Sequence, residues 1–142
     1  MDKTTEELLE ILKSSSLEAY LKNNDDELIK NPLSNYLNAL LDEKNLKKAA
    51  VIEKSGIFNI YAYQIFSGVK IPSRDKLICL CMGMDLTIDE TQTLLKYSGY
   101  ALLYPRNKRD SVIISALKSH DSVIRCNITL DELGLSPLWA ID

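Results

Sequence analysis

Histidine and cysteine are scarce in this chain of 142 residues, which argues against a metal centre. The single histidine, His120, has no nearby ligand partners, and the three cysteines lack the spacing of a metal site. Cys79 and Cys81 stand two residues apart on an expected helix and point to different sides, and Cys126 is remote in sequence. We therefore expect no metal site and interpret the cysteines as buried free thiols.

The usual sequence signatures of catalysis are missing as well. The five glycines form no phosphate-binding loop, and no nucleophile stands with a visible base and an orienting partner. We expect no catalytic residues and no cofactor.

Long apolar runs are also absent. No window approaches the ~20 residues of a membrane-spanning helix, and the first ten residues, MDKTTEELLE, lack the basic start and apolar run of a secretory signal. The apolar fraction of 46% and charged fraction of 26% are typical of soluble globular proteins. We expect a cytoplasmic protein with no membrane partner.

No segment shows strand-like alternation, whereas apolar residues recur at helical spacing throughout, so the predicted fold class is all-α, a compact helical bundle. Residues 1–31 are expected to form an N-terminal helical appendage with helices at about residues 5–13 and 17–21. Residues 32–86 are the predicted central domain, and residues 87–142 a C-terminal helical extension packed on it. Thr87 and Glu90 have capping-box spacing, and Trp139 is expected to act as an anchor.

Residues 48–73 hold the most informative pattern, two short helices joined by a tight turn. Lys48–Ser55 carries Ala49, Val51 and Ile52 on one stripe and ends at Gly56, which tolerates positive φ. A second helix, Asn59–Ser67, has a buried face at residues 61, 62, 65 and 66 and ends at Gly68. Pro72 and Ser73 then introduce another helix, expected over residues 74–82.

These residues resemble the Cro/C1-type helix-turn-helix of bacterial and phage regulators, the XRE family. The resemblance covers roughly residues 33–86 and is carried by Gly56, Tyr61, Ala62, Ile65, Gly68 and Pro72-Ser73. It implies a positioning helix at Lys48–Ser55 and a recognition helix at about residues 59–67, lying in the major groove of double-stranded DNA. It further implies a transcriptional regulator that acts as a homodimer on two half-sites.

Three departures from that family pattern affect the expected geometry. Ile52 occupies a position where the family commonly has a small residue, which predicts a wider separation of the two helices. Phe58 replaces a polar N-cap, so the cap is expected to shift to Asn59. Ile60 and Tyr63 make the expected groove-facing surface more apolar than that of a typical DNA reader.

Positive charge is concentrated in the same region. Residues 44–76 contain seven basic and two acidic side chains, a net charge of +5, against −3 for the whole chain and therefore −8 for the remainder. Such a distribution favours a phosphate-binding surface, although lysines that merely solvate helix faces are the alternative interpretation.

Roles for single residues follow from their chemistry. Amide side chains pair with adenine edges and apolar ones contact the thymine methyl, whereas cations and helix N-termini hold phosphates. The predicted base-reading residues are Asn59, Ile60, Tyr63 and Gln64, and the predicted phosphate contacts are Lys47, Lys48, Lys70, Ser73 and Arg74.

A second hypothesis is a protein-interaction adaptor, of antitoxin or anti-repressor type, that retains the helix-turn-helix fold without reading DNA. In that hypothesis Phe58, Ile60 and Tyr63 bind a protein partner. Operator sequence, regulatory sign and inducing signal have no signature in the sequence.

Overall fold

Helices account for all the regular structure in the computed structural model, which describes residues 3–24 and 32–138. The predicted all-α class is thereby confirmed. The chain divides into two compact units, Met1–Pro32 and Leu33–Asp142. Trp139 lies outside the described residues. No helix within the described ranges is long and apolar enough to cross a membrane.

The N-terminal unit contains α1 (Thr5–Ser14) and α2 (Leu17–Asn23), each begun by a hydroxyl cap. The Thr4 and Ser16 side chains accept hydrogen bonds from backbone N–H groups in the first turns. Neither helix has a buried residue. Some of their large apolar side chains, among them Leu9, Leu17 and Leu21, are exposed in the described structure.

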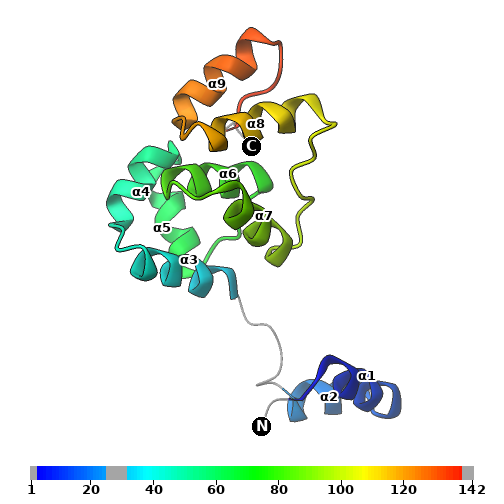
Figure 1. Ribbon diagram of the computed structural model, residues 1–142. Coiled ribbons are helices and arrows are strands. Elements are labelled where there is room, and N and C mark those ends of the chain that lie inside the picture. The colour runs from blue at the N-terminus through cyan, green and yellow to red at the C-terminus, as the bar shows by residue number, and fades with distance from the viewer. Residues whose placement is uncertain (1–2, 25–31, 139–142) are drawn as a thin grey trace. The chain divides into compact units, whose positions relative to one another are not determined.

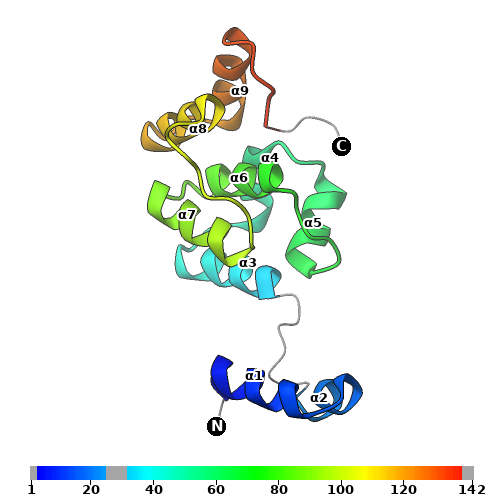
Figure 2. The same cartoon turned by 90° about the vertical axis from the view of Figure 1, so that its right-hand side faces the viewer.

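The larger unit is a bundle around α6 (Arg74–Gly83), which packs against α4, α7 and α9 (Figures 1 and 2). Every residue from Leu77 to Gly83 is buried, so α6 has no solvent-facing side over this stretch. The surrounding helices are α3 (Pro32–Glu43), α4 (Lys48–Ser55), α5 (Asn59–Ser67), α7 (Ile88–Tyr97), α8 (Lys108–Lys118) and α9 (Val123–Glu132). Burial of such side chains contributes about 1.5–3 kcal/mol each.

The closest helix contact joins α6 to α4 at Gly83. A Cβ atom there would lie 2.7 Å from the carbonyl oxygen of Val51 and 3.3 Å from the amide nitrogen of Ser55. Glycine therefore allows the backbones of α4 and α6 to approach each other directly.

Reciprocal ion pairs fasten α8 to the beginning of α6. Arg74 binds both carboxylate oxygens of Asp110, at 3.2 and 3.1 Å, and Arg109 binds both of Asp75, at 3.0 and 2.9 Å. Both arginines also donate to backbone carbonyls, Arg74 at residues 101 and 102 and Arg109 at residues 136 and 137. The pairs thus hold α6, α8 and two loops together.

The helix bounds expected between residues 48 and 67 are confirmed, but two local predictions were wrong. Ala49 is exposed, and Ser55 occupies the buried position beside Val51 and Ile52. The N-cap of α5 does not shift to Asn59: Phe58 is the capping residue and makes no side-chain hydrogen bond. The capping box of Thr87 and Glu90 is present.

All three cysteines are buried free thiols, as predicted. Burial raises the pKa of Cys79 and Cys81 to about 12 and that of Cys126 to about 11. The reactive thiolate is therefore scarce at neutral pH, and these side chains act as small apolar groups of the core.

A Gly83→Ala substitution is expected to lower the free energy of unfolding by about 1–3 kcal/mol, because the added methyl collides with the α4 backbone. Helix propensity alone predicts the opposite, that alanine raises the free energy of unfolding by about 1 kcal/mol. Urea unfolding of the two proteins measures the difference. Equal or greater stability of the variant would contradict this expectation, because it would mean that α4 can move away from residue 83 without a loss of stability.

Glu90 is expected to make stability depend on pH. A hydrogen bond from Lys44, 2.7 Å away, lowers the pKa of Glu90 below its ordinary value of 4.5, with a further contribution from the Thr87 amide. The stabilisation is complete above pH 4.5 and is lost as the pH falls through the lower native pKa. The stability difference between the parent and Glu90→Gln should therefore shrink between about pH 7 and about pH 3 in urea unfolding. Lys44→Gln should reproduce this shrinkage, and a difference independent of pH would contradict the assignment.

Candidate functional site

Helices α4 and α5 are joined by the three residues 56–58, and buried side chains set their arrangement. Gly56 adopts a φ of 74°, in the left-handed region that glycine tolerates. The buried Ser55 hydroxyl donates to the Ile52 carbonyl at 2.6 Å and accepts from the Ile57 amide at 3.2 Å. The turn is therefore held by a local polar contact beneath the surface.

The far end of α5 is attached to α3 by one amide side chain. Asn38 donates through Nδ2 to the carbonyl of Phe66 and to that of Ser34, both at 2.8 Å. The buried face of α5 consists of Ala62, Ile65 and Phe66. With one face buried and its end anchored, α5 presents the opposite face outward at an edge of the bundle, across α6 from α7 (Figure 2).

An open groove runs along this outward face. Its lining consists of Lys48 and Ser67 together with all four predicted base-reading residues, Asn59, Ile60, Tyr63 and Gln64. The structure thus brings these four side chains onto one accessible surface and adds a cation from α4.

The two amides in the groove are chemically uncommitted. Within the described part of the chain, the side chains of Asn59 and Gln64 make no hydrogen bond. By contrast, Gln92 both donates to and accepts from the backbone of Leu103, at 2.9 and 2.7 Å. The Gln92 amide is therefore engaged within the fold, whereas no contact among the described residues engages the two amides of α5.

Large apolar side chains on α5 and next to it in the sequence are exposed. Phe58 is 85% exposed, Ile60 74% and Tyr63 46%. Val69 and Ile71, which follow α5, are also exposed. Val69 and Ile71 were not among the residues predicted from the sequence, because an alternating apolar pair in a short loop has no helical period that would assign it to a face.

The N-termini of α4 and α5 differ from those of the other helices. Among helices whose caps lie in the described ranges, these two lack a side-chain cap, at Lys47 and Phe58. The remaining six, α1, α2, α6, α7, α8 and α9, are each capped by a serine, threonine or asparagine side chain. The first-turn N–H groups of α4 and α5 are therefore not taken up by a side-chain cap, and such groups favour anions.

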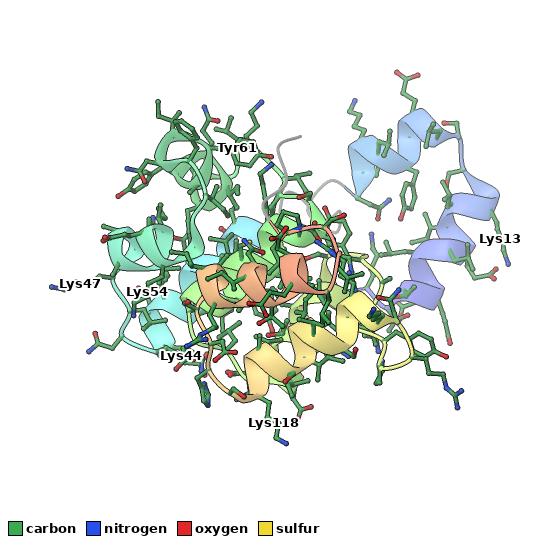
Figure 3. All side chains as sticks on the ribbon, turned by 90° about the horizontal axis from the view of Figure 1, so that it is seen from above. Lys13, Lys44, Lys47, Lys54, Tyr61 and Lys118 are labelled. Atoms are coloured by element: carbon green, nitrogen blue, oxygen red, sulfur yellow. The ribbon has the colours of Figure 1, made fainter. Side chains whose placement is uncertain are left out.

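Several lysines lie close to this surface. Lys47 extends outward at the beginning of α4 (Figure 3), and Lys70 is exposed after α5. The Lys48 ammonium is 5.4 Å from the centre of the Phe66 ring, so it stays near the groove. Lys76 lies over Tyr61 at 4.8 Å.

Two of the predicted phosphate contacts are already occupied by internal interactions. The Arg74 guanidinium is bound to Asp110 and to two carbonyl groups, so we remove it from the predicted contacts. The Ser73 hydroxyl accepts from the Lys76 amide as the N-cap of α6. The predicted phosphate contacts that remain are Lys47, Lys48 and Lys70.

The charge of the region is lower than its sequence indicates. Of the seven basic residues between positions 44 and 76, Lys44 and Arg74 pair with Glu90 and Asp110, which lie outside that segment. These two ion pairs neutralise part of the positive charge that the segment carries in the sequence.

Other chemistry finds little support in the described residues. They contain no group of three or more His, Cys, Asp or Glu side chains that could hold a metal ion. His120 lies 2.8 Å from Asp85, and both are exposed, at the turns that follow α8 and α6.

Replacing Arg74 and Lys70 by alanine should have different effects on stability. Arg74→Ala removes the cation that pairs with the largely buried Asp110, whose carboxylate keeps the hydrogen bond from the Tyr104 amide. The loss should cost more than the ~1 kcal/mol of an exposed pair and less than the roughly 3–5 kcal/mol of a fully buried one. Lys70→Ala should change the free energy of unfolding by less than about 0.5 kcal/mol. Urea unfolding distinguishes the two, and equal effects would contradict the structural role of Arg74.

Comparisons of the chain with protein families, with curated proteins and with solved structures give no match. The function is therefore inferred from the residues of this surface.

Proposed function

We propose that the protein is a sequence-specific regulator that binds double-stranded DNA, with α5 in the major groove. The observation that carries the proposal is the open groove on α5, which gathers four base-reading candidates beside Lys48. Two of them are amides whose side chains make no hydrogen bond among the described residues. Major-groove recognition requires an exposed helix face that carries uncommitted donors and acceptors, and this face meets that requirement.

Phosphate contacts are assigned to the lysines and helix N-termini that border the groove. Lys47 and Lys48 stand at the start of α4, whose first turn has no side-chain cap, and Lys70 follows α5. A phosphate held there would gain both the ammonium charge and the backbone N–H groups. These contacts would set the register of α5 on the duplex.

A homodimer is part of the proposal, because regulators of this geometry usually bind two half-sites one helical turn apart. Apolar side chains suited to an interface are exposed on other helices, among them Ile124 and Ile128 on α9 and Leu9 and Leu17 in the N-terminal unit.

The second candidate is the protein-interaction adaptor. It is favoured by the exposure of Phe58, Ile60, Val69 and Ile71, which is more apolar surface than direct base reading needs. In this alternative the same groove receives an apolar segment of a partner, and the surrounding lysines favour an acidic one.

Selection from a random duplex library at about 150 mM salt, where non-specific binding is weak, tests the proposal. We expect one enriched motif, bound by the parent and weakened at least about tenfold by combined Asn59→Ala and Gln64→Ala substitutions, because each amide pair contributes about 1–3 kcal/mol. Fluorescence anisotropy measures the affinities. Lys48→Ala and Lys70→Ala should each reduce the slope of log affinity against log salt by about one.

Asn35→Ala, an exposed amide on α3, is the matched control and should leave the affinity unchanged. Loss of binding in the Asn35 variant would show that the effect is not local to α5. If no duplex is enriched, the DNA-binding proposal is contradicted, and the protein-interaction adaptor becomes the favoured function.

A further inference from the structure

We propose that the α5 surface selects A·T base pairs and uses thymine C5-methyl groups as apolar contacts, with no base contact to guanine contributing to its specificity. The inference rests on the proposed function, because it concerns which duplex the surface selects. It comes from the juxtaposition of two free amides and two exposed apolar side chains in one groove.

The first argument is the absence of charge from α5. Its residues, NIYAYQIFS, include no lysine, arginine, aspartate or glutamate. In the major groove, guanine is read chiefly by arginine or lysine, and the cytosine amino group by carboxylates. The helix therefore lacks the charged side chains that chiefly read guanine and cytosine.

The second argument is the chemistry of the amides. Asn59 and Gln64 line the groove and make no side-chain hydrogen bond within the described part of the chain. An amide can donate to adenine N7 and accept from adenine N6 at the same time. Each therefore suits the adenine of an A·T pair.

The third argument concerns the apolar side chains of the groove. Ile60 and Tyr63 lie in the same groove, 74% and 46% exposed. Thymine alone among the four bases presents a methyl group in the major groove. Covering one such methyl removes apolar surface on both partners from water, which corresponds to about fourfold in affinity.

Lys48 is the only charged member of the described groove lining. It belongs to α4, not α5, and its ammonium lies 5.4 Å from the Phe66 ring centre. In the proposed docking α4 crosses the backbone, so this cation is placed for a phosphate and not for a guanine edge.

Replacement of thymine by deoxyuridine provides the test, since it removes only the C5-methyl and keeps Watson–Crick pairing. The motif obtained by selection is resynthesised with deoxyuridine at each thymine in turn, and affinities are measured by anisotropy. We expect an A·T-rich half-site in which at least one thymine loses about fourfold in affinity on replacement.

Ile60→Ala should bind the thymine duplex more weakly and no longer distinguish it from the deoxyuridine duplex. Leu133→Ala is the matched control, because this leucine is 45% exposed at the end of α9. It should keep the full thymine preference. Because both residues are exposed, neither substitution should unfold the protein, and thermal melting checks this.

The outcomes separate the inference from the proposed function. An enriched motif whose essential pairs are G·C, or a site insensitive to deoxyuridine, overturns the inference and leaves DNA binding intact. Dependence on guanine that disappears in Lys48→Met also overturns it. If no duplex is enriched and a protein partner is bound instead, both the inference and the DNA proposal fail.

Discussion

Burial of α6 is the constraint on which the larger unit depends. Its residues from Leu77 to Gly83 are all buried, so the neighbouring helices pack around a helix that is apolar on every side over this stretch. Gly83 brings α4 into backbone contact, and Asp75 and Arg74 at the other end hold α8 through paired carboxylate bonds. The position of α4, and through the short turn that of α5, follows from these contacts.

The candidate surface follows from the peripheral place of α5. One face is buried against the bundle, the Asn38 side chain holds its end, and Ser55 supports its beginning. None of these contacts uses the outward side chains. A rigid support with uncommitted amides and apolar groups is the arrangement that binding sites require, because the support fixes geometry while the surface remains available.

Electrostatics shows how tertiary structure redistributes charge. Residues 44–76 carry a marked positive charge in the sequence, yet acidic residues from α7 and α8 neutralise part of it in the fold. Those pairs fasten helices together. Lys47, Lys54 and Lys70 remain exposed, and Lys48 lies in the lining of the groove.

The sequence by itself determined the all-α class, the bounds of α4 and α5, the buried thiols and the outward set on α5, because helical periodicity and glycine stops are local properties. Tertiary structure alone decided three other matters. The ion pair between Arg74 and Asp110 was not predictable from local sequence, because the two residues lie 36 positions apart and only the fold brings them together. Ser55 replaced Ala49 in the interior, because the direction from which α6 packs selects the buried stripe of so short a helix. The exposure of Val69 and Ile71 was not predictable either, because the path of the loop decides which way its side chains point and a loop has no regular period.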